Sequence, residues 1–164
     1  MATINSSGLY YPLTKMNFLV SVDNVSNVAA FSEVTGIDAS VDVIEFRQGN
    51  ANSLAPVKIQ GLVKHGNITL KMGYVRAQDF KQWIIDCVSA QRKETPRRNV
   101  TIELIDINQS APDQIVTTPA DATLTWVLKD AWVAKYTGPD LNASASEVAV
   151  EAVEIAYEEL TIPN

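Results

Sequence analysis

The chain has 164 residues, of which 46% are hydrophobic and 20% charged, so it is long enough for one domain with a sizeable core and too short for two ordinary domains. Its formal net charge of −6 argues against general nucleic-acid binding, because affinity for phosphate backbones comes mainly from clustered Lys and Arg. The single cysteine excludes an intramolecular disulfide framework. The first residues lack the basic and apolar regions of a signal peptide, and no stretch approaches the ~18 apolar residues of a membrane-spanning helix. We therefore expect a soluble product made in the cytoplasm.

The charge is unevenly distributed along the chain. Residues 140–164 contain six of the 19 carboxylates and no Lys or Arg, so the remaining 13 acids balance the 13 bases of residues 1–139. The six are Asp140, Glu147, Glu151, Glu154, Glu158 and Glu159. The net charge of the chain therefore comes from residues 140–164 alone, and its explanation is to be sought in that segment.

The N-terminal part is expected to consist of short strands joined by turns. After an arm over residues 1–15, residues 16–22 and 28–34 are rich in β-branched and aromatic side chains, with a turn-prone segment between them. Residues 40–47 and 67–72 are two further runs of this kind. Each run is predicted to be a strand.

The segments between these runs predict how the strands connect. Residues 28–47 are expected to form a long hairpin that bends around residues 36–39. Residues 48–66 are expected to form a long connection, since they contain several Gly and Asn residues and a Pro. Connections of that length in a compact domain are usually functional or mobile.

One segment has the periodicity of an amphipathic helix. Within residues 77–93, apolar side chains recur at i, i+3, i+4, i+7 and i+8. This stripe consists of Phe80, Trp83, Ile84, Cys87 and Val88. The opposite, polar face carries Gln78, Asp79, Gln82, Asp86 and Ser89. Pro96 is expected to stop the helix.

The C-terminal half returns to strand patterns. Residues 98–107 alternate, with Val100 and Ile102 on one face, and a polar loop with two Pro residues follows. Residues 124–136 are predicted to be either a strand pair or one bent strand interrupted near residues 129–130.

The acidic segment, residues 147–160, allows two interpretations. Its glutamates recur at helical spacing, which favours an acidic-faced helix. It also holds a β-prone set whose apolar phase shifts by one residue between Val150 and Val153, and a strand with a bulge near Ala152 would accommodate that shift. Composition alone does not separate the two.

No residue cluster points to catalysis or to a cofactor. The lone histidine, His65, lies in an expected loop, where an exposed residue is a far commoner interpretation than a general base. Cys87 belongs to the apolar helix stripe and is interpreted as a core residue. Because there is no histidine pair, no Cys-rich spacing and no phosphate-binding glycine motif, we expect no metal and no cofactor.

Positive charge is concentrated in one place. The expected helix end and the loop after it contain Arg92, Lys93, Arg97 and Arg98. A solvated helix end and loop is the commoner interpretation. The alternative is a docking patch for an acidic partner surface, such as another copy of the chain.

A chain made mostly of strands has sheet edges that need to be covered. Long exposed edges pair with other chains unless they are blocked or charged. Repeated contacts between identical subunits give rings or helical stacks. Self-assembly is therefore a natural class of function for this chain.

Several segments resemble those of a known family. They are Phe31–Ile37 (FSEVTGI), Val43–Asn50 (VIEFRQGN), Gly61–Lys64 (GLVK), Asn67–Gly73 (NITLKMG) and Glu147–Ala149 (EVA). In order and at similar spacing, from about Lys15 to Leu160, the chain resembles the tail tube proteins of contractile phages and related injection systems. It departs from the family pattern at residues 50–55, 59–61 and 71–73, which fall in and beside the expected inter-ring loop.

The resemblance implies a fold and an assembly. The fold is expected to be mainly β: a single, compact, sandwich-like or barrel-like domain of antiparallel strands with one helix, in which the acidic segment is a strand. Copies are expected to form hexameric rings with a continuous inner β-barrel, and the rings to stack into a rigid hollow tube. The tube is expected to be a passive conduit, not an enzyme, that sheath contraction drives through a target envelope.

The resemblance also implies partners. They are other copies of the chain, a sheath protein, baseplate or tube-initiator and spike proteins, a terminator protein, and luminal cargo that is DNA or an effector protein. The assembled particle is expected to be a phage tail or a contractile injection particle.

Three groups of residues acquire candidate roles from the resemblance. The candidate channel-lining or inter-subunit residues are Asp42, Glu45, Glu147, Glu151 and Glu154. The candidate ring-stacking residues are Arg47, Asn50, Asn52, Leu54 and Lys58. The candidate sheath-facing helix residues are Asp79, Gln82 and Asp86. Acidic side chains on the bore would repel nucleic acid and keep cargo from sticking, so we hypothesise an acidic channel lining.

Two other classes of function compete with a tube protein. The first is a monomeric β-barrel module that binds a small ligand, and the second is an enzyme. Rings or tubes of uniform width in negative-stain micrographs would favour the tube, whereas a strictly monomeric species at all concentrations would contradict it.

Overall fold

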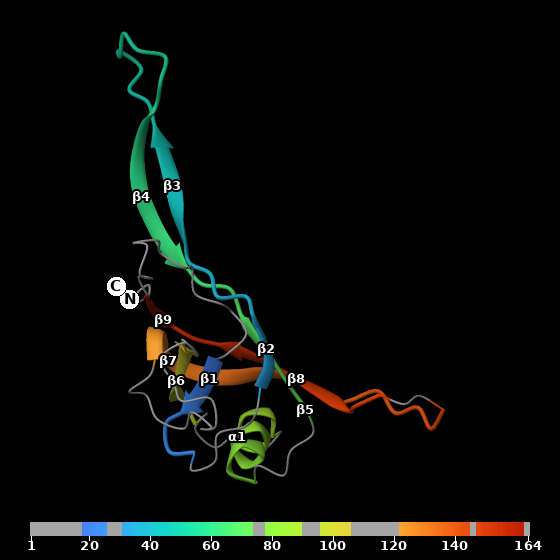
Figure 1. Ribbon diagram of the computed structural model, residues 1–164. Helices are drawn as coiled ribbons and strands as arrows, with labels where there is room; N and C mark the ends of the chain where they lie inside the picture. Colours follow the sequence, from blue (N-terminus) through green and yellow to red (C-terminus); the bar gives the residue numbers. More distant parts are fainter. Residues whose placement is uncertain are drawn as a thin grey trace, which may run out of the picture.

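The computed structural model describes residues 18–25, 31–73, 78–89, 96–105, 122–144 and 147–162. Within them the chain forms nine strands and one helix (Figure 1). The strands are β1 (Phe18–Val22), β2 (Phe31–Thr35), β3 (Ser40–Phe46), β4 (Val57–Lys64), β5 (Ile68–Gly73), β6 (Arg98–Ile105), β7 (Ala122–Thr137), β8 (Val150–Ala156) and β9 (Glu159–Thr161), and the helix is α1 (Gln78–Val88). The expected N-terminal arm and the proline-containing loop after β6 lie outside the described residues. The expected fold class, mainly β with one helix, is confirmed.

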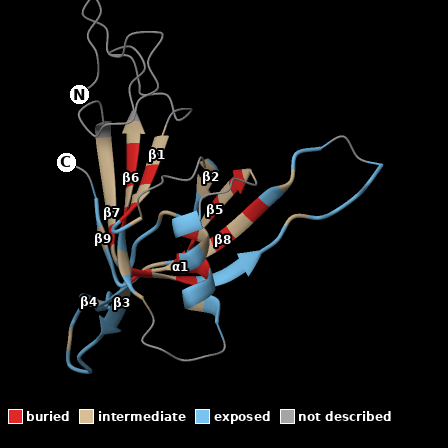
Figure 2. Ribbon diagram, turned by 90° about the horizontal axis from the view of Figure 1, so that it is seen from below, coloured by how far each residue is buried: buried red, intermediate tan, exposed pale blue. Residues whose placement is uncertain are grey.

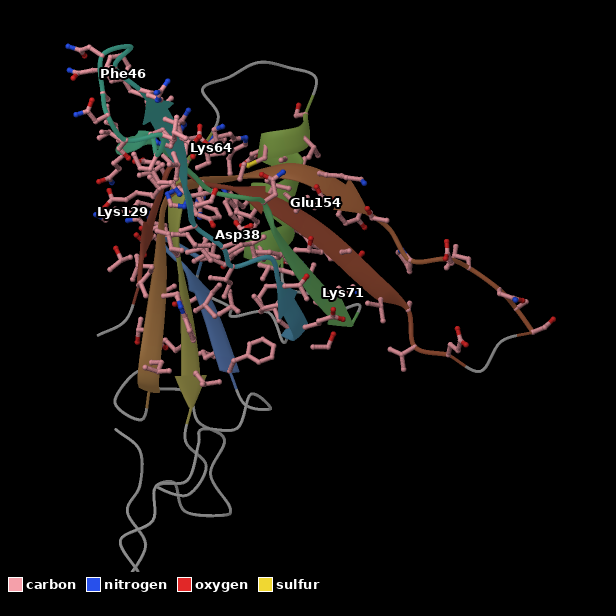
Figure 3. The ribbon with its side chains drawn as sticks, turned by 90° about the horizontal axis from the view of Figure 1, so that it is seen from above. Asp38, Phe46, Lys64, Lys71, Lys129 and Glu154 are labelled. Carbon is pink, nitrogen blue, oxygen red and sulfur yellow. The ribbon has the colours of Figure 1, made fainter. Side chains whose placement is uncertain are left out.

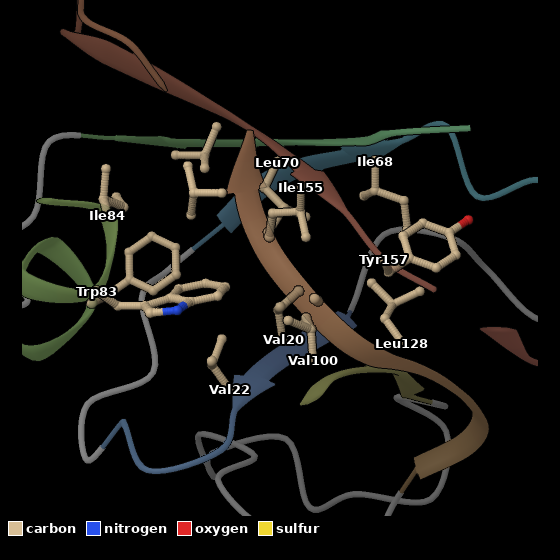
Figure 4. Close-up of a cluster of buried hydrophobic side chains, with 14 of the residues drawn as sticks. Val20, Val22, Ile68, Leu70, Trp83, Ile84, Val100, Leu128, Ile155 and Tyr157 are labelled. Carbon is tan, nitrogen blue, oxygen red and sulfur yellow. The ribbon is translucent and has the colours of Figure 1, made fainter. Parts of the chain in front are cut away.

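One antiparallel sheet of seven strands forms the body of the molecule. Its order is β1-β6-β7-β8-β5-β2, and β9 pairs with β7. The strand β7 is long and curved, so its first part pairs with β6 and its last part, residues 132–137, pairs with β8 (Figure 4). Asp130 has a positive φ of 51° between the two parts. Of the two interpretations of this segment, the bent strand is correct.

The core lies between the two parts of this sheet and α1 (Figures 2 and 4). Alternate residues of the central strands point into it, including Ile68, Leu70, Met72, Val153 and Ile155. From the helix, Phe80 stands edge-on to Phe31 with ring centroids 5.5 Å apart. Trp83 is buried and donates its Nε1–H to the carbonyl oxygen of Pro96 at 2.8 Å, which satisfies the polar tip of the indole.

The predicted amphipathic helix is confirmed by α1. Phe80, Trp83 and Ile84 are buried, Cys87 is half-buried and Val88 is exposed. The helix ends at Val88, earlier than predicted, because no further apolar side chain follows at helical spacing to pack on the core. Within the described part of the chain, no helix combines the length and the apolar character needed to cross a membrane.

The hairpin predicted for residues 28–47 is wrong. The strands β2 and β3 do not pair with each other: β2 pairs with β5, and β3 pairs with β4. The chain bends at residues 36–39 without reversing, so β2 and β3 follow one another beside β4 and β5 (Figure 1). The connection predicted for residues 48–66 is correspondingly too long, since residues 57–64 form β4. The alternating burial that reveals a strand is missing in β4, because nearly all of its side chains are exposed.

The acidic segment forms a strand, β8, and not a helix. The bulge expected near Ala152 is wrong, because β8 pairs with β5 without a register shift. The buried residues of this segment alternate strictly and are Glu151, Val153, Ile155 and Tyr157. The apolar pattern shifts by one residue between Val150 and Val153 because Glu151, whose side chain is a carboxylate, occupies a position that faces the core. The register shift lies in β7, opposite β8.

Candidate functional site and assembly surfaces

The strands β3 and β4 form a two-stranded ribbon that projects from the body (Figures 1 and 3). Its exposed large apolar side chains are Val41, Val43, Ile44, Phe46, Val57, Ile59, Leu62 and Val63. A two-stranded ribbon is marginally stable in water by itself, and contiguous exposed apolar surface marks an interaction site. The ribbon therefore needs a covering partner.

The pairing register divides the ribbon into two different faces. Side chains that lie opposite one another, or two residues apart along a strand, share a face. At the far end of the ribbon, one face consists of Ile44, Phe46, Val57 and Ile59. We call these four residues the apolar ribbon face. On the other face at the same level, Glu45 lies opposite Lys58.

A loop of residues 47–56 joins the two strands at the tip of the ribbon. Arg47 donates its Nε–H to the carbonyl oxygen of Ser53 at 3.3 Å, and the hydroxyl of Ser53 accepts from the backbone N–H of Ala55 at 3.2 Å. Leu54 is 85% exposed. Of the candidate ring-stacking residues, the tip loop holds Arg47, Asn50, Asn52 and Leu54, and β4 holds Lys58.

A hydrogen-bonded junction connects the ribbon to the body. The Asp38 carboxylate accepts from the backbone N–H of Gly66 at 2.6 Å, and the Tyr157 hydroxyl donates to the carbonyl oxygen of Asp38 at 3.1 Å. Burial, together with the charge of Asp38, raises the pKa of Tyr157, which keeps its hydroxyl protonated as a donor. The His65 ring lies 5.2 Å from the Tyr157 ring, and its buried Nδ1 has no hydrogen-bond partner among the described residues. His65 thus lies in a loop, as expected, but it is half-buried and not exposed.

On the body, β2, β5, β8 and the last part of β7 form a four-stranded sheet with one face toward the core. We call the opposite side of this sheet the outer face. Its residues include Glu33, Thr35, Thr69, Lys71, Lys135, Thr137, Ala152 and Glu154. Lys71 Nζ lies 2.9 Å from Glu33 Oε2, and Lys135 Nζ lies 3.6 Å from Glu154 Oε1. The outer face thus combines small polar side chains with paired charges.

Bases from other parts of the chain balance the glutamates of the acidic segment. The ion pairs are Glu151–Lys81, Glu154–Lys135, Glu158–Arg97 and Glu159–Lys129. The four cations come from α1, β7 and the residue before β6. Most of the charge that is crowded in the sequence is therefore compensated in the folded subunit.

The candidate channel residue Glu151 is only 1% exposed, so its expected place on an accessible surface is wrong. Tyr136 donates its hydroxyl hydrogen to Glu151 Oε1 at 2.7 Å, and Lys81 Nζ lies 3.6 Å from the same oxygen. Oε2 is buried without a hydrogen-bond partner among the described residues. The Glu151 carboxylate therefore ties β8 to β7 and α1 inside the subunit.

The other candidate channel residues occupy three different places. Asp42 pairs with Lys64 at 2.7 Å near the base of the ribbon, and Glu45 lies farther along the ribbon. Glu147 is exposed just before β8, and only Glu154 lies on the outer face. The structure does not bring these carboxylates together into one acidic surface.

The three candidate sheath-facing residues share the exposed side of α1. Asp79, Gln82 and Asp86 are exposed, and Gln82 donates its side-chain N–H to Asp86 Oδ1 at 2.8 Å. Ile85 is 55% exposed on the same helix. The stripe pattern does not reveal Ile85, because it lies between the apolar and polar positions of the helix.

The two described arginines of the candidate basic patch are engaged within the subunit. Arg97 pairs with Glu158 and lies 4.8 Å from the centre of the Trp132 ring. Arg98 donates to the carbonyl oxygens of Asp23 at 3.2 Å and Asn24 at 2.9 Å. Their geometry favours a structural role over a docking patch. The remaining two candidates, Arg92 and Lys93, lie outside the described residues.

Comparison with protein families identifies the chain. The model of one family, described as T4-like virus tail tube protein gp19, matches residues 14–161. The chain belongs to this family of tail tube proteins. The family resemblance seen in the sequence is confirmed, and with it the function of a tail tube protein of contractile systems. The small-ligand module is not favoured.

Solved structures support the same assignment. The tail tube chain is 25% identical to a chain of the PVC sheath-tube complex, an extracellular contractile injection system in its extended state, over 97% of both chains with a TM-score of 0.74. It is also 25% identical to a chain of the PVC sheath/tube terminator, over 95% of this chain and 99% of that one, with a TM-score of 0.75. At 10% identity and a TM-score of 0.50, Hcp1 from Flavobacterium johnsoniae shares the fold over 88% of this chain and 93% of its own. Comparison with curated protein sequences finds no match.

Burial shifts the pKa of two further groups of the tail tube chain, the half-buried Cys87 and the buried Glu103. Burial raises the pKa of the Cys87 thiol, which keeps it protonated and therefore a poor nucleophile. Glu103 on β6 is 6% exposed, and burial raises the pKa of its carboxyl group. The alternation of β6 places Glu103 on the side away from Val100 and Ile102, so the sequence gives no signal of this burial.

Proposed function

We propose that six copies of this chain close into a ring and that the rings stack into the hollow inner tube of a contractile tail or injection system. The observation that carries the proposal is the β3–β4 ribbon, whose exposed apolar side chains lie outside the core of their own subunit. Burying such side chains stabilises an assembly by roughly 25 cal/mol per Å² of apolar surface removed from water. A second copy of the chain supplies a partner at every ribbon.

Ring stacking is the role that fits the direction of the ribbon. The ribbon and its tip loop extend well beyond the seven-stranded sheet (Figure 1). We propose that the apolar ribbon face packs on the adjacent ring, and that the tip-loop residues Arg47, Asn50, Asn52 and Leu54 contact it as well. Lys58 lies on the opposite face of the ribbon, across from Glu45, so this contact does not include it. The hydrogen bonds of Asp38 to Gly66 and Tyr157 connect the ribbon to the body, which supports a fixed direction for this contact.

The remaining partners follow from the tube. Similar chains come from structures described as a sheath-tube complex, a sheath/tube terminator and a 6-fold symmetrised baseplate of the anti-feeding prophage. We propose the corresponding sheath, terminator, baseplate, tube-initiator and spike proteins as partners, with Asp79, Gln82 and Asp86 of α1 toward the sheath. The tube acts as a conduit for DNA or effector protein and performs no chemistry of its own.

Electron microscopy of two variants tests the stacking. We expect the purified wild-type chain to form tubes of uniform width, and Ile44→Thr with Ile59→Thr to form rings that no longer stack. The substitutions keep β-branched side chains in the ribbon but remove apolar surface from the apolar ribbon face. Tubes of wild-type length from the double variant, or a wild-type chain that is monomeric at all concentrations, would contradict the proposal.

The matched control is Ile85→Thr. Ile85 is similarly exposed but lies on α1, away from the ribbon, and Ile and Thr differ little in helix propensity. We expect this variant to form tubes like the wild type, because the sheath is absent from the experiment.

A further inference from the structure

The connection between β7 and β8 is a second segment that projects from the body, in addition to the ribbon (Figures 1 and 3). It spans residues 138–149, of which the structure describes 138–144 and 147–149, and we call it the β7–β8 loop. Leu141 is 89% exposed and Val148 is 79% exposed, so neither side chain packs on the core of its own subunit. Both side chains are therefore accessible to another molecule.

The β7–β8 loop and the ribbon leave the four-stranded sheet of β2, β5, β8 and β7 at opposite ends. The ribbon joins the end of β2 to the start of β5, and these two strand ends are neighbours, since Thr35 lies opposite Thr69. The β7–β8 loop precedes Val150, which lies opposite Gly73 at the other end of β5. The two projections therefore extend from the two ends of the same strands.

The two projections also carry opposite net charge. The far end of the ribbon with its tip loop, residues 43–60, contains two bases and one acid, which give a net charge of +1. The β7–β8 loop contains Asp140 and Glu147 and no base, which give a net charge of −2, and both carboxylates are exposed. Complementary charge favours a contact between the two kinds of projection over a contact between two of the same kind.

Projections at opposite ends also suit an open stack of rings. When rings stack head to tail, the ribbon end of one ring meets the β7–β8 loop end of the next, and a single kind of contact repeats along the stack. A contact between two ribbons would instead use up the ribbons of both rings. Further growth would then require two acidic loop ends to meet, and like charges oppose that contact.

We propose that the ribbon of each copy docks on the β7–β8 loop of a copy in the adjacent ring. Leu54 and the apolar ribbon face pack against Leu141 and Val148, and Arg47 lies beside the carboxylates of the loop. This inference rests on the ring stacking proposed above and names the surface that receives the ribbon. The tube consequently has two chemically different ends, one with free ribbons and the other with free acidic loops.

Site-directed cross-linking tests the contact. Leu54→Cys is combined in turn with Leu141→Cys and with Val148→Cys in a Cys87→Ser background, so that the introduced thiols are the only ones, and assembled tubes are treated with a short bismaleimide. Each copy then links to one copy in the ring on either side, so we expect a covalent ladder that continues past six copies on a denaturing gel. The matched control pairs Leu54→Cys with Ile85→Cys. Because Ile85 is exposed on α1, away from both projections, we expect no ladder from it.

The pattern of products separates the contact from the tube itself. Tubes that give no ladder with either pair, a ladder that stops at six copies, or an equal ladder from the control would overturn the proposal and leave the tube standing. A cross-linked dimer from Leu54→Cys alone would show that ribbons meet ribbons, which also overturns it. Absence of tubes from the wild-type chain would instead contradict the proposed function.

A charge exchange keeps the contact testable if the cysteine variants do not assemble. Arg47→Glu places an acid beside the carboxylates of the β7–β8 loop, so we expect tube formation to need an about tenfold higher protein concentration. Adding Asp140→Lys and Glu147→Lys should restore tube formation, whereas damage confined to the tip loop would not be repaired from the other projection. The control, Lys129→Glu, makes the same kind of charge change on the body, beside Glu159, and should leave the concentration unchanged. Equal effects of Arg47→Glu and Lys129→Glu, or no restoration by the loop substitutions, would overturn the proposal.

Discussion

Glu151 is the residue whose sequence context is most misleading about its environment. It stands in a run of acidic residues, yet its side chain faces the core of the subunit. A buried carboxylate is tolerated only when it is paired and hydrogen-bonded, and Tyr136 and Lys81 supply these interactions. Both come from elements distant in sequence, so neither was foreseeable from the pattern of β8.

We expect Glu151→Ala to lower the free energy of unfolding of the subunit by about 3 kcal/mol, because it removes the carboxylate that both Lys81 and the Tyr136 hydroxyl contact inside the subunit. Glu151→Gln should cost less, since the amide oxygen can still accept from Tyr136. Chemical denaturation measures both changes. Glu154→Ala, which removes an exposed ion pair, is the control and should cost less than about 1 kcal/mol. A cost for Glu151→Ala no greater than for Glu154→Ala would refute the interpretation.

Glu103 makes stability depend on pH in a defined direction. Burial raises the pKa of its carboxyl group in the folded chain above the unfolded value, so folding favours the protonated form. Its stabilising contribution is complete below the unfolded pKa, about 4.3, and is lost as pH rises through the folded pKa. We expect Glu103→Gln to raise the thermal midpoint at pH 7 and to have little effect near pH 4. An equal change at the two pH values would show that charge is not the cause.

At the scale of elements, the ribbon was the part that the sequence described least well. Its first strand is β-rich in sequence and is predicted, whereas its partner strand falls in a segment whose several Gly and Asn residues and Pro predict a loop. Alternating apolar and polar residues indicate a strand with one buried face, whereas both faces of this ribbon are exposed in the subunit. The helix and β5 were foreseen because each packs one clear apolar face on the core.

The start of the ribbon depends on a glycine. Gly36 has a φ of +89°, and a Cβ there would lie 2.5 Å from the carbonyl oxygen of Asn67. We expect Gly36→Ala to lower the free energy of unfolding by about 1–3 kcal/mol and to reduce tube length, because the backbone must move where the ribbon leaves the body. Denaturation and electron microscopy measure the two effects.

The control for this glycine is Gly49→Ala in the tip loop. A Cβ at Gly49 meets no atom within 4 Å, so we expect the stability of this variant to be within about 0.5 kcal/mol of the wild type. Similar losses for the two variants would mean that the backbone conformation at Gly36 is not the cause.

At the scale of the whole molecule, the fold redistributes the charge. The acidic C-terminal segment faces cations from other elements, and the outer face carries equal numbers of described acids and bases. The exposed apolar surface is instead gathered on the ribbon. Assembly of the tube is therefore expected to depend more on apolar burial and strand pairing than on net charge.

Local periodicity and family motifs lie in consecutive residues, so the amino-acid sequence is enough to assign the family, the mainly β class, the helix and most of the strands. The three-dimensional structure is needed to show that β3 pairs with β4, that Glu151 is buried and that four of the terminal glutamates form ion pairs. These properties depend on which distant segments meet across a sheet or pack on a helix, and a one-residue change of register would exchange the buried and exposed sides of a strand. The pairing between distant strands therefore could not be inferred from the order of residues alone.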